Sequence, residues 1–144
     1  MTNMMYLKGL EVALDALFQE AAAPSGTIKL SYMALAYTPD PATENYFADI
    51  SADVASGSPT ESLANIDIRI DTGNLRVEMD ADDVSETPVT TFTNKFVVWL
   101  DTGNAATSPL IACIDIVEGT LAPVAGVLAL TFNAEGILAI KTLS

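Results

Sequence analysis

The first element that the pattern of apolar positions predicts is an amphipathic helix over residues 1–23. Its apolar side chains recur at steps of three and four residues, which places them along one helix face; they are Leu7, Leu10, Leu14, Leu17 and Phe18. Pro24 disfavours helical geometry in the residue before it, so we expect the helix to end near residue 22 or 23. This stripe is suited to docking on a sheet or, alternatively, to contact with a partner.

Beyond Thr27 the apolar period becomes two, which is typical of β-strands. The clearest pair is 66–70 and 75–79, in which apolar and charged residues alternate on either side of Asp71-Thr72-Gly73-Asn74, and this pattern predicts a hairpin. The further strand candidates are 27–37, 89–93, 95–100, 110–116, 127–132 and 137–142, the last two as a closing hairpin. We therefore predict one domain over 1–144 that is mainly β: an antiparallel β-sandwich or small barrel with one N-terminal α-helix.

Residues 38–61 are predicted to form a long polar loop that begins at Thr38-Pro39-Asp40-Pro41. Within it lies a short apolar island of Tyr46, Phe47 and Ile50, which we expect to anchor the loop to the core. Loops of this length are more often functional than idle. The island and the apolar stripe of the helix are therefore our candidate interface residues.

Charge and composition exclude several classes of function. The 144 residues include 6 Lys and Arg against 19 Asp and Glu, a formal charge of −13, which disfavours binding to nucleic acid and to anionic membranes. There is no histidine, and the single cysteine cannot form an intrachain disulfide. Charges within residues 8–20 do not suit a signal peptide, and the apolar stretch 121–140 is interrupted by Pro, Gly, Asn and Glu, which favours strands over a membrane span.

The tripeptide Asp-Thr-Gly occurs at residues 71–73 and again at 101–103, each time after an apolar run. Aspartic proteases use this tripeptide, with two aspartates sharing one proton. Here the copies lie 30 positions apart in one small domain, whereas the two-lobed enzymes separate theirs by a full lobe. Asp, Gly and Asn also supply turn geometry between strands, and this is the interpretation we favour.

Three other features bear on chemistry. Asp80, Asp82, Asp83 and Glu86 form a carboxylate cluster that is a candidate calcium site, although Val84 and Ser85 depart from an EF-hand loop. Cys113 lies in a predicted strand with no histidine to activate it, so we expect a small buried residue. Trp99 is expected to pack in the core. The common nucleotide-binding and nucleophile motifs are missing from the sequence, so we predict no enzyme activity and no cofactor.

The chain resembles a family of small structural proteins encoded among the virion genes of tailed bacteriophages. The similarity runs in the same order along nearly the whole chain, in stretches at residues 6–11, 27–30, 37–40, 47–50 and 80–84, and above all in Asp101-Thr102-Gly103-Asn104-Ala105-Ala106-Thr107-Ser108-Pro109-Leu110-Ile111-Ala112 with Ile114-Asp115 after it. Members of this family are virion-associated and contribute no catalytic residues.

This resemblance implies a virion protein that is made in the bacterial host cytoplasm. Its acidity argues against contact with packaged DNA and for an outer position. We therefore expect a capsid decoration (cement) protein, a homo-oligomer that stabilises contacts between capsomers and binds the major capsid protein or other virion proteins. The alternatives are a neck, tail or baseplate component, including a fibre-attachment module, and a calcium-dependent binding module.

Overall fold

The computed structural model describes residues 6–16, 27–58, 60–86, 91–116, 119–122, 128–132 and 136–141. Within these ranges the chain is mainly β, as the sequence predicts, and its sheets do not close into a barrel. The helices are α1 (Leu7–Asp15) and α2 (Phe47–Ile50), with short 3-10 helices η2 (Ser51–Asp53) and η3 (Ala105–Thr107). The strands are β1 (Thr27–Tyr32), β2 (Glu61–Ser62), β3 (Asp67–Asp71), β4 (Arg76–Asp80), β5 (Val84–Glu86), β6 (Lys95–Asp101), β7 (Leu110–Asp115), β8 (Leu128–Leu130) and β9 (Leu138–Lys141).

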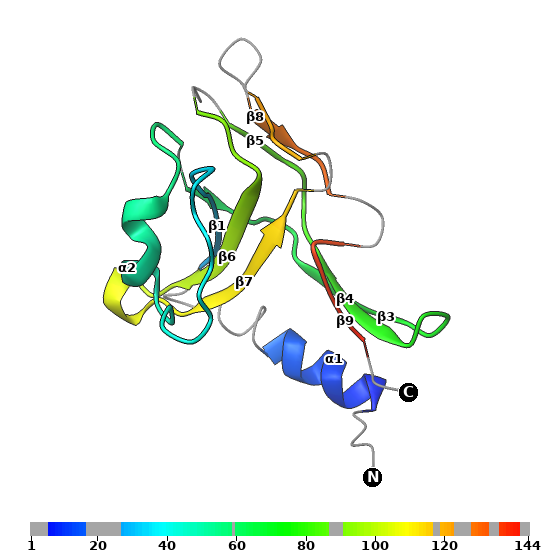
Figure 1. Ribbon diagram of the computed structural model, residues 1–144. Helices are drawn as coiled ribbons and strands as arrows, with labels where there is room; N and C mark the ends of the chain where they lie inside the picture. Colours follow the sequence, from blue (N-terminus) through cyan, green and yellow to red (C-terminus); the bar gives the residue numbers. More distant parts are fainter. Residues whose placement is uncertain are drawn as a thin grey trace.

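The strands form three antiparallel sheets (Figure 1). The first sheet has the order β2-β1-β6-β7, the second has the order β3-β4-β9, and the third pairs β5 with β8. Helix α1, blue in Figure 1, lies beside the second sheet, and α2 lies beside the first. The long pairings of β6 with β1 and β7 make the first sheet the continuous framework of the molecule.

The main core lies between the first and second sheets. Alternate residues of β1 and β6, such as Leu30 and Val98, face Val77 and Met79 of β4, and all four are fully buried. Leu14 of α1 is buried in the same core, so the helix docks on a sheet as its apolar stripe predicts. Burial of these side chains supplies the hydrophobic stabilisation that holds the sheets together.

A second core covers the opposite face of the first sheet, and the loop 38–61 closes it. Its buried members are Met33, Tyr37, Ile50, Val97 and Trp99. Strand β6 is therefore buried on both faces, which explains why it is a continuous apolar run instead of an alternating one. The expected core position of Trp99 is confirmed.

The hairpin predicted from 66–70 and 75–79 is confirmed by β3 and β4, which pair antiparallel from Asp67 opposite Asp80 to Asp71 opposite Arg76. The closing hairpin is wrong. Strand β8 pairs with β5, and β9 pairs with β4 in a different sheet. The Ile137 amide donates to the Met79 carbonyl at 2.7 Å, which attaches the last strand to β4 and separates it from β8.

Other boundaries also differ from the sequence-based expectation. Strand β1 ends at Tyr32 instead of residue 37, because the chain turns there and the Tyr37 amide bonds the Ala34 carbonyl. The short strands β2 and β5 and the helix α2 were not expected, since two to four residues carry too little periodicity to be recognised. Residues 1–5 and 17–23 of the predicted helix and 89–90 of the predicted strand 89–93 lie outside the described residues, and the strand prediction is wrong for 91–93, which hold only an isolated bridge between Thr93 and Leu121.

Candidate functional site

The loop 38–61 is a structured segment held by its own carboxylates. Asp40 accepts hydrogen bonds from the Ala42 amide at 3.0 Å and the Thr43 hydroxyl at 2.9 Å, and these bonds hold the pKa of Asp40 below its usual value. Asp49 accepts from the amides of Tyr46 and Asn45, both at 2.9 Å, and its pKa is lowered for the same reason. Carboxylate capping of this kind fixes the course of the loop before it reaches the sheet.

The apolar island anchors the loop to the second core. Ile50 is fully buried, and the Phe47 ring stacks on Trp99 with their centroids 3.9 Å apart and an angle of 10° between the rings. The Trp99 indole N–H donates to the Ser31 hydroxyl at 3.0 Å, which fixes the ring on which Phe47 rests. Of the three island residues proposed as interface residues, Ile50 is thus a core residue of the monomer, and Tyr46 alone has a largely exposed side chain.

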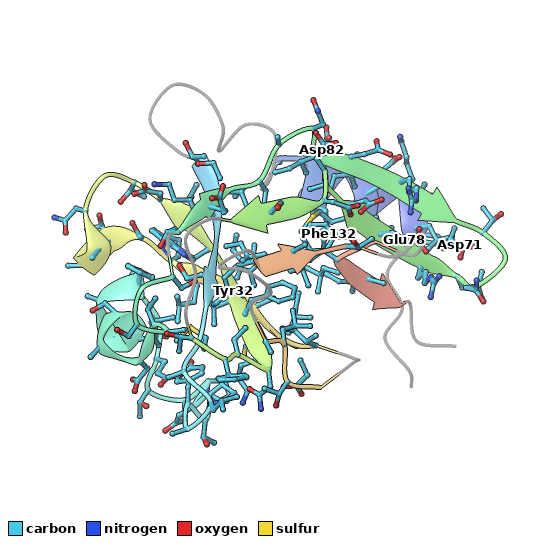
Figure 2. All side chains as sticks on the ribbon, turned by 90° about the horizontal axis from the view of Figure 1, so that it is seen from above. Tyr32, Asp71, Glu78, Asp82 and Phe132 are labelled. Atoms are coloured by element: carbon cyan, nitrogen blue, oxygen red, sulfur yellow. The ribbon has the colours of Figure 1, made fainter. Side chains whose placement is uncertain are left out.

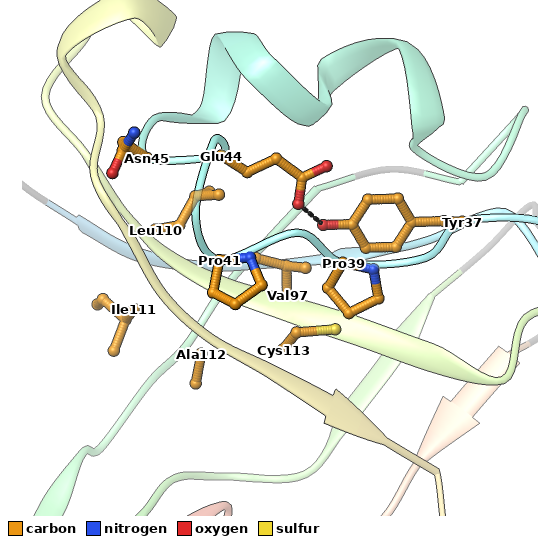
Figure 3. A pocket seen from close by; sticks show the side chains of 10 residues that line it. All are labelled: Tyr37, Pro39, Pro41, Glu44, Asn45, Val97, Leu110, Ile111, Ala112 and Cys113. Carbon is orange, nitrogen blue, oxygen red and sulfur yellow. Dashed lines mark hydrogen bonds between the residues drawn. The ribbon is translucent and has the colours of Figure 1, made fainter.

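A groove of about 310 Å³ opens between the start of this loop and strand β7 (Figure 3). The loop contributes Tyr37, Pro39, Pro41, Glu44 and Asn45, and the sheet contributes Val97, Leu110, Ile111, Ala112 and Cys113. The two prolines and the aliphatic side chains make about half of its surface apolar, and polar groups, including Glu44 and Asn45, make the rest. A concave site that combines apolar and polar groups is a candidate binding site.

Hydrogen bonds of Tyr37 and Glu44 stabilise the loop wall of the groove. The Tyr37 hydroxyl donates to a Glu44 carboxylate oxygen at 2.8 Å, and the same oxygen accepts the Asp40 amide at 2.8 Å. Burial and the neighbouring Glu44 carboxylate raise the pKa of Tyr37, so its hydroxyl stays protonated at every physiological pH. The Lys95 ammonium donates to the Tyr37 carbonyl at 3.0 Å and attaches this wall to β6. The groove is therefore preformed.

The prediction that Cys113 is buried is wrong, because the residue is exposed on β7. Strand β7 is the last strand of the first sheet. The loop 38–61 covers the centre of this sheet and leaves part of the same face of β7 exposed. The thiol faces the groove beside Pro39 (Figure 3). Partial burial there, followed by the negative charge of Asp115, raises the pKa of the Cys113 thiol, which is the opposite of what an activated nucleophile requires.

Both Asp-Thr-Gly sequences form turns, which is the interpretation that the sequence favours. Asp71 accepts the amides of Gly73 at 3.0 Å and Asn74 at 3.1 Å in the turn between β3 and β4. Asp101 accepts the Gly103 amide at 2.8 Å and pairs with Lys29 at 2.7 Å. The two aspartates belong to different sheets, and the pKa of each is lowered, whereas a protease dyad requires two adjacent carboxylates that share a proton.

The acidic turn does not gather its carboxylates around one point. Asp82 accepts the Asn65 side-chain amide at 2.6 Å, and Asp83 accepts the Phe132 backbone amide at 2.8 Å. Asp80 accepts the Ala81 amide at 2.9 Å and lies 3.5 Å from Arg69. The side chain of Glu86 lies outside the described atoms, and the described part of the chain holds no cluster of three or more His, Cys, Asp or Glu residues suited to a metal.

The second sheet carries a compact charged cluster on its outer face. Glu78, whose side chain is only 5% exposed, bonds Arg69 at 2.8 Å and Arg76 at 2.7 Å. Arg76 also lies 3.2 Å from Asp71, so the cluster extends to the turn of the hairpin. Figure 2 shows Asp71 and Glu78 together on this hairpin, with Tyr32 far from them in the first sheet. Each of these charges has an opposite partner, so the desolvation of Glu78 is compensated by the two arginines.

Some of the helix residues proposed as interface residues are buried in the core of the monomer, as Ile50 of the island is. Leu14 is buried and Leu7 is partly buried against the main core, so both serve the monomer. Leu17 and Phe18, and the side chain of Leu10, lie outside the described residues and atoms. The groove residues Tyr37, Pro39, Pro41 and Glu44 were not predicted from the sequence, because only folding of the loop brings them opposite β7.

Comparisons with known proteins give no relative for this chain: no family model matches it, and neither a curated protein nor a solved structure is significantly similar. Among the helices of the described residues, none combines the length and the apolar character that crossing a bilayer would require.

Proposed function

We propose that this protein is a structural component of a bacteriophage virion, most specifically a decoration (cement) protein on the outside of the capsid. The proposal is supported by the resemblance along nearly the whole chain and by the −13 charge, which suits a surface away from packaged DNA. Its partners are the major capsid protein or other virion proteins, and it assembles with copies of itself.

The observation that carries the proposal is the apolar surface that remains after both cores are complete. Tyr6, Val12, Leu35, Tyr46 and Phe92 are between 45% and 81% exposed. Tyr6 and Val12 belong to α1 and its N-cap and Tyr46 to the loop 38–61, the two regions that the sequence marks as contact segments, while Leu35 follows β1 and Phe92 precedes β6. Large exposed apolar side chains on a highly charged chain are suited to permanent contacts between subunits.

Counting the polypeptide in purified particles tests the proposal. Cryo-electron microscopy with quantitative mass spectrometry should find hundreds of copies on the head, in a fixed ratio to the major capsid protein. A few copies at the neck, tail or baseplate would replace the decoration role with the tail alternative. Absence of the polypeptide from intact particles would contradict any virion role.

The contact segments are tested separately. Replacing exposed Tyr46 and Phe92 together with serine should remove the protein from particles, because both side chains are available to a partner and neither is a member of the monomer's cores. The matched control is Leu75→Ser, a similarly exposed residue in the β3–β4 turn. Equal incorporation of all variants would contradict the contact role of these segments.

A further inference from the structure

The outer edge of β7 is an open strand edge beside the groove. Strand β7 ends the first sheet, and it pairs with β6 from Asp115 opposite Lys95 to Leu110 opposite Trp99. The Ile116 amide bonds the Asn94 carbonyl. In an antiparallel pair, alternate residues bond the neighbouring strand, so this bond determines which residues of β7 face β6. Residues 112, 114 and 116 therefore direct their backbone groups toward β6, and Cys113 and Asp115 direct theirs outward. No described segment pairs with these outward groups.

The protein already uses the first part of this edge for strand-like pairing. Tyr46 forms an antiparallel bridge with Pro109, the Phe47 amide bonds the Ser108 carbonyl at 2.8 Å, and the Leu110 amide bonds the Asn45 carbonyl at 3.0 Å. The loop residues that precede this bridge line the groove across from β7. An added strand would continue along β7 from the point where the loop stops, with its backbone bonded to Cys113 and Asp115.

The groove supplies the side-chain subsite that such a strand needs. Val97, Leu110 and Cys113 lie on its sheet wall, and Pro39 and Pro41 lie opposite (Figure 3). Because alternate side chains of a strand point to the same face, one apolar side chain of an added strand would enter the groove while its neighbours point away. Backbone bonds and one filled pocket together are the general features of recognition by strand addition.

The charge around this edge selects the occupant. Glu44 stands in the loop wall and Asp115 on the exposed end of β7, whereas one cation, Lys95, lies opposite Asp115 on β6 and donates to the Tyr37 carbonyl. After burial, the charges of Asp115 and Glu44 raise the pKa of the Cys113 thiol and that of Lys95 lowers it, so two anions face one cation at this edge. A second copy of this chain would bring another −13 to the edge, whereas a cationic segment would be attracted to it.

We propose that the edge of β7 binds an extended segment of a partner protein in which a small apolar residue has lysine or arginine two positions before and after it, on the same face of the strand. The segment adds to the first sheet as a fifth strand, places one apolar side chain in the groove, and sets its cations near Glu44 and Asp115. This proposal does not depend on the virion role, because binding is measured on the isolated protein.

The test uses the isolated full-length chain and a blocked seven-residue peptide with a central valine, lysine two positions to either side of it and serine at the remaining positions. Two-dimensional NMR should show the peptide shifting the amide signals of Cys113 and Asp115 and slowing their hydrogen exchange, with affinity falling as salt is raised. A peptide with glutamate in place of lysine should bind at least tenfold more weakly. A lysine-valine peptide whose bonding amides are N-methylated should lose binding, since it cannot pair with the edge.

Variants test whether the charges of Asp115 and Glu44 attract the peptide. Asp115→Asn and Glu44→Gln should each weaken the lysine-valine peptide about two- to fivefold, and Asp67→Asn, on an edge strand of the second sheet, should leave binding unchanged. The proposal is overturned if the glutamate peptide binds equally, if the shifted amides lie outside the β7 edge, or if no peptide binds. Concentration-dependent protection of Cys113 and Asp115 without peptide would overturn it in favour of pairing between two copies.

Discussion

At the scale of single residues, an ion pair within the first sheet joins Asp101 of β6 to Lys29 of β1 at 2.7 Å. The Lys29 hydrogen bond, followed by the Gly103 amide, lowers the pKa of Asp101. A carboxylate whose pKa is lower in the folded state adds stability above its unfolded pKa of about 3.9 and loses that contribution as the pH falls through its folded pKa.

Asp101→Asn isolates the charge, because asparagine can still accept the Gly103 amide. We expect the variant to have a lower free energy of unfolding than the wild type at pH 7. The difference should shrink as the pH falls below about 4 and vanish once Asp101 is protonated in both states. Urea unfolding at a series of pH values measures it, and a difference independent of pH would contradict the ion pair.

Glu78 is a buried carboxylate between Arg69 and Arg76, and its removal tests what the charged cluster contributes to stability. Removing one partner of a buried charged cluster leaves the others poorly compensated. Because Arg69 is 38% exposed, water reduces this cost, and we expect Glu78→Ala to lower the free energy of unfolding by about 2 kcal/mol. Chemical denaturation measures the change, with Asp53→Asn, an exposed carboxylate in η2 away from the cluster, as the control, and equal stability of both variants would contradict the role.

At the scale of elements, an aromatic stack is one of the contacts that hold α2 to the first sheet, beside the buried Ile50. Phe47→Ala removes the ring that lies 3.9 Å from Trp99, and we expect a loss of about 2 kcal/mol together with a red shift of tryptophan emission. Trp99 is the single tryptophan of the chain, so the emission reports this contact alone. The control Phe92→Ala, at a 52% exposed ring, should leave the spectrum unchanged.

The entry to β9 depends on one glycine. Gly136 has a φ of +86°, and a Cβ there would lie 2.5 Å from the Met79 carbonyl oxygen of β4. Gly136→Ala should therefore lower the free energy of unfolding by about 2 kcal/mol or more, whereas Gly103→Ala, with φ +84° but open space, should cost about 1 kcal/mol. Thermal unfolding of both variants measures the difference, and equal losses would place β9 away from β4.

At the scale of the whole molecule, the acidic chain attracts cations generally, and the residues that the structure describes hold no carboxylate cluster that would concentrate them. The carboxylates of Asp80, Asp82 and Asp83 bond different partners. We expect CaCl₂ and MgCl₂ at equal ionic strength to raise the melting temperature equally, by screening the −13 charge, and a chelator to cause no further loss. A selective rise with calcium would establish the calcium-binding alternative.

The groove could not be predicted from the sequence because its walls come from segments that are distant in the chain. The Thr38-Pro39-Asp40-Pro41 turn indicates where a strand ends, but it carries no information on which sheet edge the loop reaches afterwards. That position follows from Phe47 and Ile50 reaching the second core, which are contacts distant in sequence. Cys113 was placed wrongly for a related reason, since the strand pattern does not reveal that β7 is an edge.

The sequence by itself determined the mainly β class, the docked N-terminal helix, the hairpin of β3 and β4 and the turn role of both Asp-Thr-Gly segments, because each depends on short-range periodicity or turn chemistry. The tertiary structure alone decided that β8 and β9 enter different sheets, that β6 is buried on both faces, and that the loop 38–61 forms a groove with β7. These features depend on contacts between residues far apart in the chain, which local patterns do not encode.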